Sequence, residues 1–153
     1  MNLDDSIYDK ITKLCEEGET LSKSGDFREA LRLFHRSWEL LPEPKEDWDA
    51  ATWILTAIGD AHFFLGDFKN VFGALSNAVL CPNGLGNPFV HLRLGQAAYE
   101  LGQMDKAKDE LTRAYMGAGR GIFATEDPKY LTYLETILQP FPRDEEVEGC
   151  EPS

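Results

Sequence analysis

A pair of glycines seven residues apart recurs three times along this chain, and this pattern limits the folds open to it. The second glycines are Gly25, Gly66 and Gly102, and the first are Gly18, Gly59 and Gly95. A small or β-branched residue follows at the fifth position after each second glycine, and a large apolar residue stands four positions further on. These residues are Ala30, Val71 and Ala107, followed by Phe34, Leu75 and Leu111. The chain therefore contains one structural unit three times.

The second glycine of each pair predicts where one helix ends and the next begins. Glycine adopts the left-handed conformation that ends a helix without a Cβ penalty. Asp26 and Asp67 then stand where an N-cap is needed, and Glu29 would complete a capping box with Asp26. The first glycine of each pair lies inside a helix, where it costs about 1 kcal/mol relative to alanine. Its recurrence predicts close contact within each helix pair, with Ala30 and Ala107 facing the glycines.

Apolar residues recur at helical spacing on both sides of each turn. In the first unit they are Ile7, Ile11, Leu14 and Leu21, followed by Phe27, Leu31, Phe34, Trp38 and Leu41. No segment keeps the alternating pattern of a β-strand, and Pro42 and Pro82 end the second helices of the first two units. We therefore expect an all-α protein.

These residues resemble the tetratricopeptide-repeat family, whose unit is a helix–turn–helix of 34 residues. The first unit matches best and covers residues 11–44, with Gly18, Leu21, Gly25-Asp26-Phe27, Ala30, Phe34 and Pro42 in the motif positions. The other two cover about 52–85 and 88–121, and depart from the motif at Val71, Gln103 and Gly119. The resemblance implies three repeats stacked as a right-handed superhelix.

Two further segments complete the expected architecture. Residues 45–51 exceed the regular spacing but continue the apolar stripe, so we expect them to lengthen the first helix of the second repeat and Trp48 to pack against Ile7 and Ile11. Asp127-Pro128 predicts the start of a last helix over about 128–138, which would cap the open end of the stack. We therefore expect a single domain over 1–139 and an acidic, flexible tail over 140–153.

The net charge of −12 restricts the kinds of partner. Phosphate repels such a surface, so nucleic acid and anionic membranes are disfavoured. The charge either attracts a basic protein partner or only keeps the protein soluble, and both interpretations stay open. The chain has no apolar run of membrane-spanning length, and its acidic first residues do not resemble a signal peptide. We expect a cytoplasmic protein.

The residues that usually carry chemistry form no recognisable group. Cys15, Cys81 and Cys150 are far apart, no C-x-x-C occurs, and the three histidines lack ligand spacing. The glycine-rich stretch 117–121 follows a helix and lacks the Lys-Ser/Thr pair of a phosphate-binding loop, so we interpret it as a flexible connector. We expect no catalytic residues, no metal, no cofactor and no small-molecule substrate, and thus not an enzyme.

The resemblance also implies where a partner binds. In tetratricopeptide-repeat proteins the first helix of each pair lines a concave groove that holds a peptide or protein segment. Transferred to this sequence, the candidate contact residues are Glu19, Trp53, Thr56, Asp60, Phe63, Phe64, Phe89, Leu92, Arg93, Gln96 and Tyr99. Exposed aromatic residues in a concavity are typical binding anchors. The alternative, that some of them pack between neighbouring first helices, stays open.

Repeats of this family that grip acidic C-termini of heat-shock chaperones use lysine, asparagine and arginine at five positions. Here these positions are Cys15, Glu19, Ala57, Phe89 and Arg93, so a carboxylate clamp is not expected.

The sequence thus favours a protein–protein interaction module with an aromatic, acidic groove. Residues 86–96 and 127–131 also resemble small bacterial repeat proteins encoded beside polymorphic toxins, which implies a toxin-neutralising immunity protein as a sharper hypothesis. The alternatives are a secretion-type chaperone, since some of these are similar acidic proteins with three repeats, and a general scaffold or adaptor.

Overall fold

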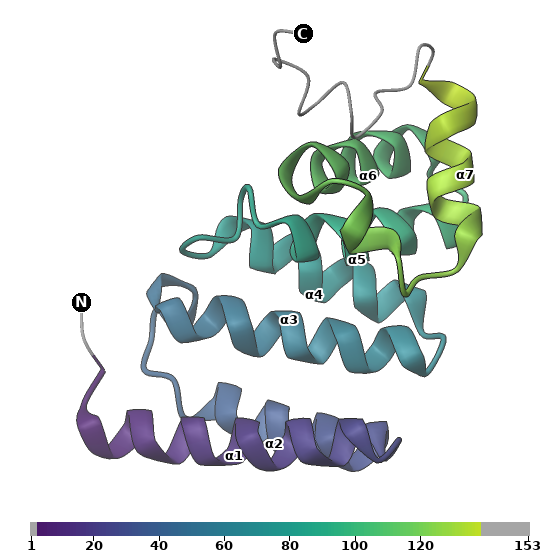
Figure 1. Cartoon of the computed structure of the whole chain (residues 1–153). Helices are drawn as coiled ribbons and strands as arrows, with labels where there is room; N and C mark the ends of the chain where they lie inside the picture. The colour runs from purple at the N-terminus through teal and green to yellow at the C-terminus, as the bar shows by residue number, and fades with distance from the viewer. Residues whose placement is uncertain (1–2, 139–153) are drawn as a thin grey trace, which may run out of the picture.

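The computed structural model describes residues 3–138, which form seven α-helices and two short 3₁₀ helices, with no strand in this part of the chain. Six helices form three hairpins: α1 (Asp5–Lys23) with α2 (Phe27–Glu39), α3 (Asp49–Phe64) with α4 (Phe68–Leu80), and α5 (Pro88–Glu100) with α6 (Met104–Ala118). The 3₁₀ helices are η1 (Lys45–Asp47) and η2 (Arg120–Phe123). Figure 1 shows the hairpins stacked in chain order, with α7 (Pro128–Ile137) beside the last one. The predicted all-α fold of three repeats plus a capping helix is confirmed.

The turns inside the hairpins use glycine as the sequence predicts. Gly25, Gly66 and Gly102 have φ angles of 85°, 75° and 78°. The Asp26 carboxylate caps α2 by accepting from the Glu29 N–H at 3.3 Å. The second half of the predicted capping box is wrong, because the Asp26 N–H donates to the Leu21 carbonyl at 2.9 Å and the Glu29 carboxylate pairs with Arg32. A capping box needs the Asp26 N–H as a donor to Glu29, but this N–H is already bonded to a carbonyl group at the end of α1.

The glycines inside the first helices allow close approach of large residues on the second helices. A Cβ atom on Gly18 would lie 2.5 Å from the Phe34 ring, and one on Gly95 would lie 2.8 Å from Leu111. The three atoms nearest to each of these two Cβ positions belong to the large residue, and the prediction that Ala30 and Ala107 also face the glycines stays untested. In each hairpin the large residue of the second helix, namely Phe34, Leu75 or Leu111, occupies the space that the missing side chain of the glycine leaves.

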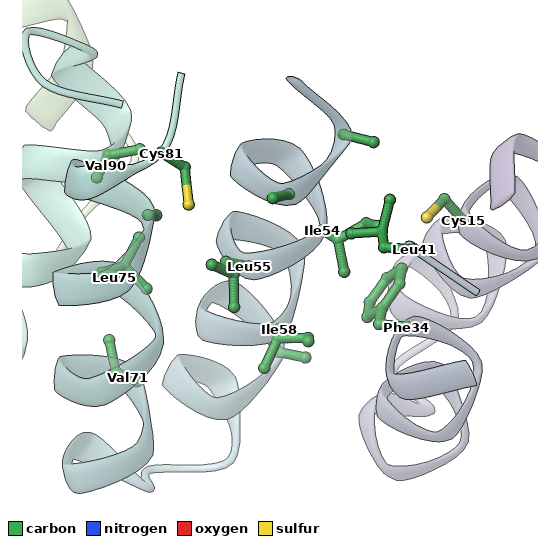
Figure 2. Close-up of a cluster of buried hydrophobic side chains, with 14 of the residues drawn as sticks. Cys15, Phe34, Leu41, Ile54, Leu55, Ile58, Val71, Leu75, Cys81 and Val90 are labelled. Atoms are coloured by element: carbon green, nitrogen blue, oxygen red, sulfur yellow. The ribbon is translucent and has the colours of Figure 1, made fainter. Parts of the chain in front are cut away.

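The core runs between the hairpins as well as inside them. Figure 2 shows Ile54 of α3 directed towards Phe34 and Leu41, while Leu55 of the same helix is directed towards Leu75 of α4. Both sides of α3 are thus buried, which holds the first two hairpins together. In α5 every side chain from 90 to 98 is buried, because α3, α4, α6 and η2 all pack on it.

Residues 45–51 do not simply lengthen α3 as predicted. Residues 45–47 form η1, Trp48 is extended, and α3 begins at Asp49. The Lys45 ammonium group donates to the Leu41 carbonyl at 2.6 Å, and the Trp48 indole donates to the Pro42 carbonyl at 2.8 Å. These bonds satisfy carbonyl groups at and beyond the end of α2, which favours the folded-back course over a longer helix. Trp48 is buried in the cluster that contains Ile11 and against which Ile7 packs. Its direct packing on these two residues stays a prediction.

The connector after α6 is more ordered than the glycine-rich sequence predicts. Gly119 has a φ of 73°, and η2 follows with Phe123 buried. Phe123, Tyr130 and Leu134 belong to a second buried cluster that joins α6 to α7. The predicted tail over 140–153 lies outside the described residues, and the domain boundary at residue 139 stays a prediction.

Candidate functional site

A groove of about 610 Å³ opens along the first helices, and we call it the central groove. Its lining includes Glu19, Ser22 and Lys23 of α1 and Asp49, Thr52, Trp53, Thr56, Ala57 and Asp60 of α3. Pro82, Asn83 and Asn87 of the α4–α5 loop, Phe89 of α5 and Phe34 of α2 complete the lining. Five predicted contact residues therefore meet here, namely Glu19, Trp53, Thr56, Asp60 and Phe89.

The five predicted aromatic anchors occupy different environments. Trp53 is 38% exposed and Phe89 is half-buried, and both line the central groove. Phe64 is 55% exposed outside this groove and stacks on Phe27 at a ring distance of 5.0 Å. Phe63 packs edge-to-face against Phe64 and Phe68. Only Trp53 and Phe89 thus combine partial exposure with a place in the groove.

Tyr99 lies at the junction with the capping helix. Its ring is 5.4 Å from the rings of both Tyr130 and Tyr133 of α7, edge-to-face in each case. The Tyr130 hydroxyl donates to Glu100 Oε1 at 2.8 Å. Burial and the hydrogen bond to this carboxylate raise the pKa of Tyr130 well above its usual range. In this structure Tyr99 packs α5 against α7 and does not line the central groove.

Arg93 is buried and forms the centre of a polar cluster. Its Nε donates to Asp60 Oδ1 at 2.8 Å, and its Nη1 donates to Gln96 Oε1 at 2.8 Å and to Glu126. The guanidinium group lies 4.2 Å from the Phe63 ring centroid and 4.9 Å from that of Phe89. The cluster therefore ties α3, α5 and the segment before α7 together.

Three of the predicted contact residues are removed from the surface by this packing. Leu92, Arg93 and Gln96 are all buried. Arg93 is the one residue that matches a carboxylate clamp, and its Nε and Nη1 groups are already bonded inside the protein. Neither Leu92 nor Gln96 can reach a partner without a rearrangement of α5.

Sequence reasoning missed the α4–α5 loop as a wall of the groove. The Thr52 hydroxyl donates to the Pro82 carbonyl at 2.5 Å, and the Asn87 side chain caps α5 by accepting from the Phe89 N–H at 3.0 Å. A Cβ atom on Gly84 would lie 1.7 Å from the Ala78 carbonyl oxygen, so the loop passes tightly over the end of α4. The Asn87-Pro88 pair, an N-cap followed by proline, is the local signal that could have placed the end of this loop.

The buried His91 side chain holds the same loop in place through hydrogen bonds. Its Nε2 accepts from the Gly86 N–H at 2.9 Å, so Nδ1 carries the proton and donates to Glu110 Oε2 at 2.5 Å. Both side chains are buried, and Lys106 Nζ lies 2.9 Å from the other oxygen of Glu110. Since both nitrogens of His91 are bonded within the protein, this pair positions the loop and is not an exposed acid–base pair.

The groove carries an excess of negative charge. Its ionisable lining residues are Glu19, Asp49, Asp60 and Lys23, and the Asp60 carboxylate is bonded to Arg93. On α1, the helix that also carries Glu19, the Cys15 thiol donates to Ser37 Oγ at 3.5 Å. Burial raises the pKa of the Cys15 thiol, and the Glu19 carboxylate adds to the effect. The exposed carboxylates of Glu19 and Asp49 favour a basic ligand.

Across residues 3–138, no three side chains of His, Cys, Asp or Glu converge in a way that could hold a metal ion. No helix in the described part of the chain has the length and apolarity needed to cross a membrane.

No family model and no curated protein matches this chain in sequence. Among solved structures, the chain is similar to the type III secretion chaperone SycD of Yersinia enterocolitica in complex with a peptide of the translocator YopD. The TM-score is 0.66 at 15% sequence identity, and the match covers 84% of this chain and 92% of that chain. A second structure of SycD, a translocator chaperone, matches with a TM-score of 0.62 at 16% identity over 85% of this chain and 91% of that chain. At such identities the similarity shows a shared fold.

Proposed function

We propose that this protein binds a segment of a partner protein in the central groove and acts as a chaperone-type binding protein, not as an enzyme. The observation that carries the proposal is the position of Trp53 and Phe89. Both rings are partly exposed at the walls of one concavity, and ring surface in such a place is the usual anchor for a bound segment.

The similarity to SycD favours the chaperone reading over the other candidates. The SycD structure contains a peptide of a translocator, and the shared fold extends over 92% of the SycD chain. A role as a toxin-neutralising immunity protein has no comparable support from the groove or from the similar structures. We therefore prefer a secretion-type chaperone, with a general adaptor as the broader form of the same proposal.

The negative charge of the groove restricts the composition that we expect of the bound segment. Asp49 and Glu19 are exposed at its walls, and the whole chain carries a net charge of −12. A segment that places apolar side chains near Trp53 and Phe89 and carries net positive charge would complement both features. An acidic segment would be repelled.

Site-specific photo-crosslinking tests the proposal. A benzoylphenylalanine residue replaces Ala57 in the groove or, as a control, exposed Lys69 on α4 or Arg113 on α6, in the cells that produce the protein. We expect crosslinks to one partner segment from position 57, and their loss when a synthetic copy of that segment is added in excess. Crosslinks to the partner from positions 69 or 113 alone would place binding on the second helices and overturn the proposal.

A further inference from the structure

A second hollow of about 380 Å³ lies beside the first turns of α1 and α3. It is lined by Leu3, Asp5, Tyr8, Trp48, Asp49, Ala50 and Trp53, and we call it the Tyr8–Trp53 hollow. Asp49 and Trp53 line the central groove as well, so the two concavities meet at these residues. A segment that occupies the groove could therefore place one side chain in this hollow.

The two aromatic rings named in the hollow are not used by the core. Tyr8 is 50% exposed and Trp53 is 38% exposed. Neither stacks on another ring or a cation among residues 3–138, unlike Phe64 and Tyr99. The third aromatic residue, Trp48, is buried and its indole N–H is bonded to the Pro42 carbonyl. Tyr8 and Trp53 thus offer ring surface to a ligand without disturbing the packing.

Among residues 3–138, no ion pair with a positively charged group involves the carboxylates of the hollow. Asp5 and Asp49 are exposed in the first turns of their helices, and none of the described residues that line the hollow with them is Lys, Arg or His. The cap of α1 is Asp4, whose carboxylate accepts from the Ser6 N–H, so Asp5 does not serve that purpose. The helix dipoles favour acidic residues at these positions, but they do not account for two exposed rings beside them.

We propose that the Tyr8–Trp53 hollow receives a lysine or arginine side chain of the segment bound in the central groove. The aliphatic stem would pack along the rings, as the stems of such side chains do on apolar surfaces. The charged end would lie over a ring face and near Asp5 and Asp49. The acidic tail of this chain is a poor occupant, because its carboxylates would face those of the hollow. This inference rests on the proposed function and specifies the chemistry of its ligand.

The test uses the full-length protein and a probe that does not depend on knowing the partner. The indole N–H resonances of Trp38, Trp48 and Trp53 are recorded by NMR, and the spectrum of Trp53→Phe assigns the third. The protein is titrated with N-acetyl-arginine methylamide, and in parallel with the citrulline analogue, which has a similar shape and no charge. We expect a saturable shift of the Trp53 resonance with the arginine probe and at least about fivefold weaker binding of the citrulline probe.

Matched variants separate a local effect from general electrostatics. Asp5→Asn with Asp49→Asn should weaken arginine binding by at least about fivefold, and Tyr8→Ala should weaken it as well. Asp9→Asn with Asp47→Asn removes the same charge from nearby exposed positions outside the hollow, and should have little effect. If both double variants weakened arginine binding equally, the binding would reflect only a general attraction of the acidic surface for cations. That result would overturn the inference.

The remaining outcomes separate this inference from the proposed function. If the crosslinked segment binds the groove but neither probe moves the Trp53 resonance, or both probes move it equally, the inference fails and the function stands. If no partner is crosslinked from the groove while arginine still shifts Trp53 selectively, the hollow is a cation site and the proposed function fails. A Trp53 shift that depends on protein concentration without any probe would identify the hollow as a contact between two copies, which overturns the inference.

Discussion

A Cβ atom on Gly59 would lie 1.7 Å from Cδ2 of Leu75, so α3 and α4 pack at their observed separation only because position 59 has no side chain. Leu75 is fully buried, and Val71 one turn earlier is too. The equivalent glycines of the other two hairpins approach Phe34 and Leu111 in the same way. This contact explains why the chain repeats a residue that weakens a helix: each hairpin gains a buried large side chain in return.

Gly59→Ala should therefore destabilise the protein. The added methyl group would force Leu75 or the backbone to move, and overpacking of this kind costs about 1–3 kcal/mol. Gly73→Ala is a matched control, because Gly73 also lies inside a helix and a Cβ atom there would meet nothing within 4 Å. The control should be stabilising by up to about 1 kcal/mol. Urea denaturation of both variants checks this, and equal midpoints would contradict the packing argument.

Removal of Arg93 should destabilise the stack rather than act on binding directly. Arg93→Met leaves the Asp60 and Glu126 carboxylates without their shared counter-charge, and breaking a buried pair in this way costs about 3–5 kcal/mol. Arg113→Met, at an exposed position on α6, should stay within about 0.5 kcal/mol of the original protein. Thermal melts followed by circular dichroism measure both, and a melting temperature of Arg93→Met equal to that of Arg113→Met would show that the buried cluster is not needed.

The central groove predicts opposite results for anchor and core residues. Trp53→Ala and Phe89→Ala should weaken binding of the crosslinked segment by about 2 kcal/mol or more at the better anchor, with smaller losses of stability. Leu75→Ala should cost about 2–5 kcal/mol of stability through the cavity it leaves. A binding titration and a melting curve on each variant test this contrast. If Trp53→Ala melts as early as Leu75→Ala and its folded fraction binds normally, Trp53 is a core residue and the partner binds elsewhere.

The two described cysteines should react slowly with thiol reagents in the folded protein. Burial raises the pKa of both the Cys15 and the Cys81 thiols, so less of the reactive thiolate exists at neutral pH than in the unfolded chain. Because the shift is upwards, the thiolate fraction recovers only as the pH rises beyond the usual thiol range. Iodoacetamide labelling of a Cys150→Ser variant, with and without urea, measures this. Equal labelling rates in both conditions would contradict the buried positions of these thiols.

Much of the fold is encoded locally and could be predicted. A glycine that ends a helix, an aspartate that caps the next one and an apolar stripe at helical spacing each act within a few residues. Gly25-Asp26 and Gly66-Asp67 therefore placed two hairpin turns correctly, and Asp127-Pro128 placed the start of α7. The resemblance to a repeat family then supplied the stacking and the face on which Trp53 and Phe89 would lie.

The partners of individual side chains were decided by the tertiary structure. Arg93 bonds to Asp60 and Glu126, each 33 positions away along the chain, and the spacing of apolar residues cannot show that both carboxylates would pair with it. Likewise, Tyr99 is covered only because α7 folds back over α5, and the α4–α5 loop becomes a groove wall only because His91 and Thr52 hold it. The sequence by itself determined where helices begin, end and pair, since those choices depend on neighbouring residues. Which residues remain exposed for a partner depends on contacts between distant segments, and these exist only once the helices are stacked.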